Sequence, residues 1–314
     1  MSRPELLTPS LLRMDGRRPY EFRSLEIHFA PDELRGSNAT AGPSTSSASS
    51  SSSASAFAGP ASSSDKADGC VRLVQGLNDV TCSVFGPRDA QLSGNRSGGS
   101  GGIGQMGVGP EGAALDVEVL AENWSSVGAE RRAGGRGDRR NVELALLVQR
   151  TLAPMISLHL YPRTSVLHLS LQIASSDGSI LATLLNTASL ALQSAGLATL
   201  DYCLATCIAF HPRSPPSVTA AGGGGGAAVG TFLIDPTLSE TQDLPYLTLA
   251  ISPRDGRVVL SLLDAGRGKV ESEKVSQGIK IGVEVLSGVF RREMEGATRE
   301  WGRRLLGGAD RRIE

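Results

Sequence analysis

Three groups of residues in the sequence are of types and spacings that could do chemistry. The first is a set of arginines within ten residues, opposed inside that span only by Asp138: Arg131, Arg132, Arg136, Arg139 and Arg140. They occupy a glycine-containing loop that leads into an expected helix, where guanidinium groups and free backbone amides favour anions such as phosphate. No aromatic residue is interleaved with them, so the pattern indicates contact with a nucleic-acid backbone rather than recognition of bases. A solvated loop without a ligand is the alternative.

The other two groups follow strand-like segments. The second is a polar turn that opens an apolar helix: Asp177, Gly178 and Ser179. The third is an acidic group: Asp235, Glu240 and Asp243. Carboxylates in such a group can hold a metal or supply an acid. An ordinary capping turn and a polar loop between strands are the alternatives for these two groups.

Several stretches imitate sites without the context that a site needs. Cys203, Cys207 and His211 are four residues apart, but their segment is rich in strand-forming residues and no fourth ligand is near, so we expect buried structural residues and no metal. Residues 102–107 and 107–112 match G-x-G-x-x-G, yet a Ser/Gly tract precedes them and a strand follows. The remaining histidines form no catalytic group. We therefore expect no bound cofactor.

The elements that must position these residues can be read from apolar periodicity. Strands are expected over residues 20–29, 70–75, 80–85, 114–121, 166–173, 203–210, 230–234, 244–251 and 258–263. Helices are expected over residues 138–153, 177–195 and 269–306. Asp177 is expected to cap the second helix and Gly196 to end it, while Gly278, Gly282 and Gly288 are expected to weaken the third. Strands in runs with helices between them favour mixed sheets with helices packed on them, an α+β fold.

Composition limits the class of protein. The low-complexity segments 36–68 (Ser/Ala-rich), 93–113 (Gly-rich) and 212–228 (Pro/Gly-rich) are expected insertions, the first of them disordered, within a single domain spanning residues 1–314. The net charge of −1 excludes a general polycation, so a nucleic-acid role requires a local patch. The four cysteines lie in apolar runs and do not form the spacing pattern of a disulfide framework, which is typical of a protein in a reducing compartment. No apolar run is long enough to cross a membrane, and a soluble intracellular protein is expected.

Five segments in this order resemble the RNase PH family, and more closely the exosome ring subunit whose archaeal counterpart carries the phosphorolytic site. They are Asp15-Gly16-Arg17, QGLNDVTCSVFGPRDA, GDRRNVELALLVQRTL, YPRTSVLHLSLQIASSDGS and DYCLATCIAF. The resemblance implies the RNase PH fold, with two βαβ-type lobes, and a six-membered ring around an RNA channel. It also implies particular partners: other RNase PH-like subunits, cap proteins with OB-type and KH RNA-binding domains, an associated hydrolytic ribonuclease and single-stranded RNA. Such subunits serve ribosomal RNA maturation and messenger RNA turnover in the nucleus, nucleolus and cytoplasm, without a membrane.

The resemblance also implies which residues stand at the family's phosphate site. Arg140 matches the arginine that helps to bind phosphate. The family's Asp-Gly-Gly-Thr-Arg turn matches Asp177 to Leu181, where Ile180 and Leu181 replace the threonine and the arginine. These aliphatic side chains cannot hold phosphate.

At the family's pair of catalytic aspartates, the first matches Asp235 and the second falls on Thr241. Glu240 stands just before that position and Asp243 just after it. We therefore expect no catalytic residues and a non-catalytic ring subunit that still contacts RNA. The alternative is an active phosphate-dependent exoribonuclease that uses Arg140, Asp235 and Asp243, and a third hypothesis is a stand-alone adaptor that has left the ring.

Overall fold

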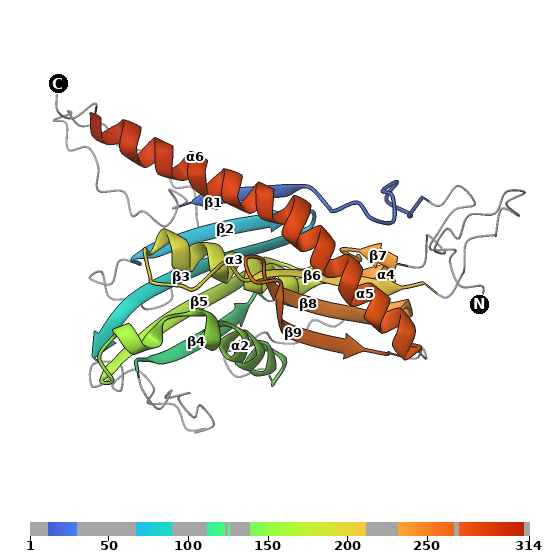
Figure 1. Ribbon diagram of the computed structural model, residues 1–314, viewed down its shortest axis with the longest axis horizontal. Helices are drawn as coiled ribbons and strands as arrows, with labels where there is room; N and C mark the ends of the chain where they lie inside the picture. The colour runs from blue at the N-terminus through green and yellow to red at the C-terminus, as the bar shows by residue number, and fades with distance from the viewer. Residues whose placement is uncertain are drawn as a thin grey trace, which may run out of the picture.

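The computed structural model describes residues 12–29, 67–89, 112–122, 125, 139–211, 232–266 and 270–310. Its strands form two sheets, and a long C-terminal helix runs diagonally across both of them (Figure 1). The segments 36–68, 93–113 and 212–228 and the two glycine motifs lie outside the described residues, apart from residues 67, 68, 112 and 113.

The first sheet is mixed. It has five strands in the order β1 (Leu25–Phe29), β2 (Gly69–Gln75), β3 (Asn78–Asp89), β5 (Ser165–Ser175) and β4 (Ala114–Ala121). Only β4 and β5 run parallel, and α2 (Arg139–Leu152) lies between them in the chain, which makes β4–α2–β5 a βαβ unit. Along β5, buried residues such as Leu167, Leu169 and Leu171 alternate with half-buried polar ones, as expected when one face packs on the core.

The second sheet is antiparallel. Its four strands follow the order β7 (Phe232–Ile234), β6 (Leu204–Phe210), β8 (Tyr246–Ser252) and β9 (Arg257–Asp264). Every residue of β6 is buried, because this strand lies between two others and under helices. The short helix α4 (Leu238–Asp243) connects β7 to β8.

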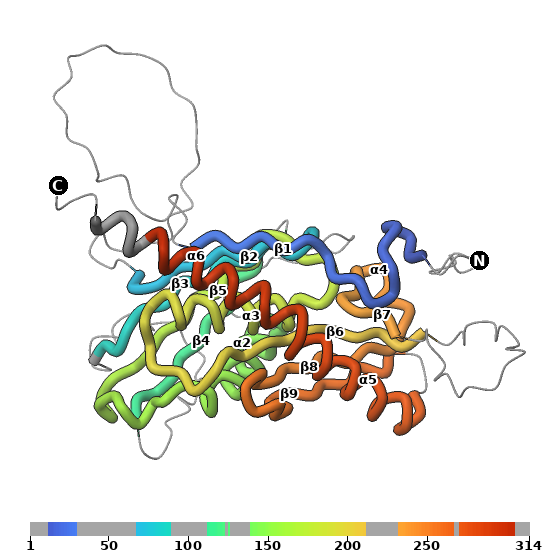
Figure 2. Tube along the Cα trace, turned by 45° about the horizontal axis from the view of Figure 1, so that its top comes forward, coloured from blue at the N-terminus to red at the C-terminus, as the bar shows by residue number. Residues whose placement is uncertain are grey.

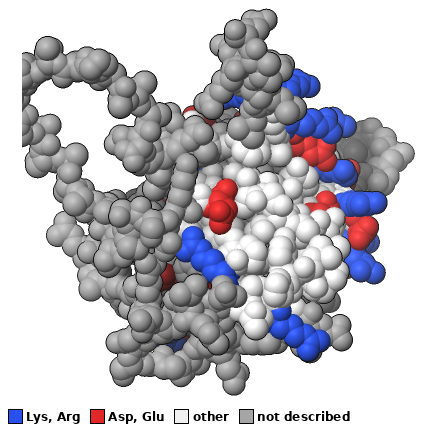
Figure 3. Space-filling model, turned by 90° about the vertical axis from the view of Figure 1, so that its left-hand side faces the viewer, with Lys and Arg blue, Asp and Glu red and all other residues white. Residues whose placement is uncertain are grey.

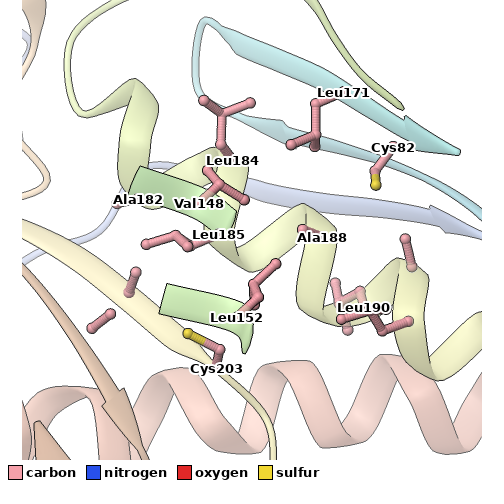
Figure 4. Packing of buried hydrophobic residues seen from close by; sticks show 14 of the residues in the cluster. Cys82, Val148, Leu152, Leu171, Ala182, Leu184, Leu185, Ala188, Leu190 and Cys203 are labelled. Atoms are coloured by element: carbon pink, nitrogen blue, oxygen red, sulfur yellow. The ribbon is translucent and has the colours of Figure 1, made fainter. Parts of the chain in front are cut away.

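Helix α3 (Ile180–Ser194) is the centre of the core. It contains no charged residue and is buried at every position from Leu181 to Leu192. It packs on β2, β3 and β6, and therefore joins the two sheets (Figure 2). Leu184, Leu185 and Ala188 meet side chains such as Cys82 and Cys203 in one apolar cluster (Figure 4). With few aromatic residues in the chain, this contact is made largely by aliphatic side chains.

The C-terminal helix is nearly continuous. It consists of α5 (Ser272–Val285), a π-helical turn η3 (Leu286–Phe290) and α6 (Arg291–Asp310). The helix continues through Gly278 and Gly282, and Gly288 lies in the π-helical turn. A Cβ at Gly282 would lie 2.6 Å from Leu249 Cδ2, so glycine here allows α5 to approach the second sheet closely.

The structure confirms the α+β class and most expected elements, with corrections at the ends. Asp177 does not cap α3: the N-cap is Ser179, and Asp177 is engaged by distant residues instead. Gly196 ends α3 as expected, at φ +69°. The acidic segment after β7 forms the short helix α4, which the sequence did not predict because six mostly polar residues show no apolar helical periodicity. Among the described helices, none has the length and apolar character needed to cross a membrane.

Candidate functional site

The turn between β5 and α3 lies directly against the segment that follows β7. Gly178 has φ +70°, and a Cβ there would lie 2.6 Å from the carbonyl carbon of Thr237 and 2.7 Å from the carbonyl oxygen of Pro236. These neighbours are backbone atoms that cannot move aside, so only glycine fits. The second and third residue groups of the sequence therefore meet at this point.

The side chain of Arg23 fills the space between them. Its Nε donates to Asp235 Oδ2 at 2.9 Å, and its Nη2 donates to Asp235 Oδ1 at 2.7 Å. Nη1 donates to the carbonyl oxygen of Asp177 at 2.8 Å, and Nη2 also donates to Ser179 Oγ at 2.7 Å. All three guanidinium nitrogens are therefore committed inside the protein.

Asp235 is buried and its acceptor oxygens are occupied. Its side chain accepts from the Arg23 guanidinium, from the Arg23 amide at 3.2 Å and from Ser179 Oγ at 2.9 Å. Burial alone would raise the pKa of Asp235, but the hydrogen bonds and charge of Arg23, with help from Gln75 and Ser179, hold this pKa below its ordinary value. The carboxylate is thus ionised and internally neutralised.

Two further arginines hold the backbone around Asp235. Arg13, which is 1% exposed, donates from Nη2 to the carbonyl oxygens of Ile234 and Pro19, each at 2.6 Å. Arg17 donates from both Nη atoms to the carbonyl oxygen of Asp235 at 3.3 Å. Burial lowers the pKa of Arg13 to about 10, although Glu240 opposes the shift. Its Nε has no hydrogen-bond partner among the described residues.

Asn78, at the end of the β2–β3 hairpin, fixes the turn from the other side. It is fully buried, donates from Nδ2 to the carbonyl oxygen of Gly178 at 2.8 Å, and accepts from the amide of Asp177 at 2.5 Å. The two ends of its amide group therefore satisfy two backbone groups of one turn. This arrangement explains why the turn keeps left-handed backbone angles at both Gly178 and Ser179.

The acidic residues of the third group do not converge. Glu240 is buried and its Oε2 accepts from the amide of Thr237 at 2.9 Å, which closes a capping box at the start of α4. Its Oε2 is also 3.8 Å from Arg13 Nη1. Thr241 Oγ1 donates back to the carbonyl oxygen of Leu238, and Asp243 is exposed at the end of α4. No second described carboxylate of this group therefore reaches the carboxylate of Asp235.

The arginine group is only partly described. Arg139 and Arg140 are exposed in the first turn of α2, and Arg139 pairs with Glu143 at 3.0 Å. The charge of Arg140 acts on Tyr246, whose pKa is raised to about 12 mainly by burial and by Asp264. Arg131, Arg132 and Arg136 lie outside the described residues. On the face shown in Figure 3, basic and acidic side chains are neighbours along one margin, and the described surface beside them is largely uncharged.

Sequence reasoning did not select Arg13, Arg23 or Asn78. Arg23 lies in a segment of alternating apolar residues, and its partners Asp177 and Asp235 are 154 and 212 positions away. No local pattern signals such a contact. At the positions that follow the turn, Leu181 is buried in the core and Ile180 packs against it, so these side chains point to the apolar interior rather than to a ligand.

Comparisons with known proteins agree with this architecture. The model of the 3′ exoribonuclease family, domain 1 (RNase PH) matches residues 61–198. The human exosome complex component MTR3 is 33% identical over 221 residues, which cover 70% of this chain and 73% of that protein. The exosome complex component SKI6 of Saccharomyces cerevisiae is 23% identical over 90% of this chain and 89% of its own. The crystal structure of rice Rrp46 superposes with a TM-score of 0.59 at 19% identity, covering 91% of this chain and 100% of that one.

Proposed function

Because the chain belongs to the RNase PH family, we propose that it is a subunit of an RNA exosome core that serves 3′-to-5′ RNA processing and degradation. Two relatives that share sequence with it, from human and from Saccharomyces cerevisiae, are named as exosome complex components. As partners we propose other RNase PH-like subunits in a six-membered ring, with cap proteins, an associated hydrolytic ribonuclease and single-stranded RNA. We also propose residence in the nucleus, nucleolus and cytoplasm, which fluorescent fusions in cells would test.

We further propose that this subunit does not itself cleave RNA. The observation that carries this proposal is the state of Asp235: both its carboxylate oxygens already accept hydrogen bonds from Arg23 or Ser179. A general acid needs a proton to give and a carboxyl group within reach of the substrate. Thr241 offers no carboxylate where the family has its second aspartate, and Glu240 is used as a helix cap. Directly after the turn that follows β5, Ile180 and Leu181 likewise lack the hydroxyl and guanidinium with which the family would bind phosphate.

Phosphate-dependent cleavage in an assembled ring is the direct test. The ring is reconstituted with this subunit, incubated with RNA and inorganic phosphate in the absence of any hydrolytic nuclease, and examined for nucleoside diphosphates. We expect no product above the phosphate-free control. Phosphate-dependent product from the wild-type ring that disappears on Asp243→Asn would support the active alternative. Asp243 is suited to this test because it is exposed, so that its replacement should leave the fold intact.

The proposed remaining role is contact with the RNA backbone through the arginine group. Arg139 and Arg140 are exposed at a helix N-terminus, which suits phosphate contacts. Replacing Arg131, Arg132, Arg136 and Arg139 with Ala should shorten the RNA protected by the ring while ring assembly persists. The matched control replaces four arginines of α6: Arg292, Arg299, Arg303 and Arg304. Equal protection in both variants would count against the role, and a stable monomer by native mass in cells would favour a stand-alone adaptor.

A further inference from the structure

An aromatic side chain lies beside the arginine group, although none is interleaved with it in the sequence. Tyr246 begins β8, and Arg140 lies in the first turn of α2. Burial and Asp264 raise the pKa of Tyr246 to about 12, and Arg140 is near enough for its positive charge to oppose that rise. Arg140 is exposed and Tyr246 is partly exposed, so both can be reached from solvent.

The phenol ring of Tyr246 is held from two sides. Its hydroxyl donates to Asp264 Oδ2 at 3.1 Å, and Asp264 is the residue directly opposite on β9. The phenol ring also packs against a small buried apolar cluster: Ala209, Leu233 and Leu244. A side chain that is already fixed loses little conformational entropy when a flat ligand stacks on it. Tyr246 is therefore suited to receive an aromatic ligand.

The charges around Tyr246 favour one orientation of a bound RNA strand. Arg139 and Arg140 are exposed at the N-terminus of α2, whose first turn contains no acidic residue, so anions are attracted there. Asp264 places a negative charge at the hydroxyl end of Tyr246, where a phosphate is repelled and an uncharged base is not. The phosphate backbone is thereby directed to the helix, and a base to the tyrosine.

We propose that Tyr246 is a stacking platform for an RNA base, beside the arginine group that binds the backbone. This inference rests on the proposed RNA role and adds the residue that receives the base. Every base has a π-face, so stacking on Tyr246 raises affinity without reading sequence. It also favours single strands, because bases within a duplex are stacked on one another and cannot reach the tyrosine.

Two matched ligands separate the base contact from the backbone contact. Fluorescence anisotropy with the purified full-length chain measures binding of single-stranded oligouridylate and of an abasic RNA of the same length and charge. Tyr246→Leu keeps an apolar side chain against the buried cluster but removes the phenol ring. It should weaken oligouridylate binding about tenfold and leave binding of the abasic RNA unchanged. Tyr246→Phe, which keeps an aromatic ring, should restore most of the lost affinity.

Tyr202→Leu is the matched control. Tyr202 is also partly exposed, but it precedes the first residue of β6, whereas Ala209, which pairs with Tyr246, lies near the last. This variant should bind both RNAs as the wild type does. Thermal unfolding of each variant shows whether it is folded.

Replacing the arginines distinguishes failure of the inference from failure of the proposed RNA role. Arg139→Ala combined with Arg140→Ala should weaken both RNAs alike and reduce the salt dependence of binding. If this variant behaves so while Tyr246→Leu weakens both RNAs equally or neither, the stacking contact is overturned and the backbone role stands. If the chain binds neither RNA, the RNA role is overturned and the stacking contact with it.

A photochemical cross-link provides a second measurement in the assembled ring. RNA that carries 5-iodouridine is irradiated on the reconstituted ring, and the cross-linked peptide is identified by mass spectrometry. Because 5-iodouridine reacts preferentially with an aromatic side chain stacked on it, we expect the cross-link at Tyr246 and its loss in Tyr246→Leu. Cross-links of this chain that fall only on residues outside β8 would overturn the proposal.

Discussion

At the scale of single residues, Asp235 supports the fold. Its carboxylate neutralises Arg23, and its carbonyl oxygen accepts from Arg13 and Arg17. Its φ of +54° is a conformation that costs a non-glycine residue about 1 kcal/mol or more, which these hydrogen bonds offset. The N-terminal segment is therefore fastened to the second sheet around Asp235 and its neighbour Ile234.

Replacing this aspartate should destabilise the protein far more than replacing its exposed neighbour. Asp235→Ala removes the nearer of the two carboxylates that pair with the buried Arg23 and leaves Asp177 at 3.2 Å, so the free energy of unfolding should fall by about 3 kcal/mol. Asp243→Ala removes the same group from the surface and should change it by less than about 0.5 kcal/mol. Urea unfolding measures both. Equal effects would show that the Arg23 contact contributes little.

The same contact predicts how stability depends on pH. Because the pKa of Asp235 is below its ordinary value of 3.8 in the folded protein, its stabilising contribution is complete above that value. It should be lost as the pH falls from about 4 through the lower folded pKa. In Asp235→Asn this part of the acid dependence should be absent when unfolding is followed between pH 2 and 7. If the loss of stability at low pH is unchanged in that variant, other carboxylates must cause it.

At the scale of elements, the C-terminal helix keeps one buried stripe over both sheets. Its buried positions are spaced by four residues: Gly278, Gly282, Leu286, Phe290 and Met294. In a regular α-helix, residues spaced by four shift around the helix axis by about 40° at each step. The extra residue of the π-helical turn cancels much of this drift. The turn therefore has a packing role where the helix passes from the second sheet to the first.

The glycines of this helix should respond to alanine in opposite directions. Gly282→Ala would place a Cβ 2.6 Å from Leu249 Cδ2 and 2.8 Å from Ile208 Cδ1. Both neighbours belong to the packed core, so we expect a loss of about 1–2 kcal/mol. At Gly296 a Cβ meets no atom within 4 Å, and Gly296→Ala should add about 0.5–1 kcal/mol through helix propensity. Stabilisation of both variants by thermal unfolding would contradict the close approach.

At the scale of the whole molecule, the two sheets share one core rather than forming separate units. The largest apolar cluster includes Val71 and Leu73 from the first sheet, Leu249 and Ile251 from the second, and Phe290 from the C-terminal helix. The ring of Phe290 also packs on Phe22, with centroids 5.2 Å apart. Loss of this contact should therefore be felt in both sheets at once.

Phe290→Ala tests this coupling. A buried aromatic truncated to alanine should cost about 3–5 kcal/mol. Hydrogen exchange should quicken together in β2 and β8, because opening of the shared core exposes both. Val289→Ala is the control, since Val289 is 60% exposed in the same turn. Faster exchange confined to one sheet would indicate two independent units.

Local pattern by itself determined most of the elements and the chemical character of the turn after β5. Periodicity is a property of neighbouring residues, so the strand at residues 114–121 was predicted to the residue and α3 to within three residues of its start. The absence of a hydroxyl and a guanidinium at Ile180 and Leu181 is likewise visible in the sequence.

Only the tertiary structure decided what Asp177 and Asp235 contact. Asp177 was expected to cap a helix. Its carboxylate instead accepts hydrogen bonds from the Arg23 guanidinium and from the backbone amide of Leu238. Asp235 was expected as a site remnant, and it is the buried counter-ion of Arg23. These partners are far apart in the chain, and they meet because α3 holds the two sheets against each other. Pairing between distant charges depends on that packing and leaves no periodic trace in the sequence.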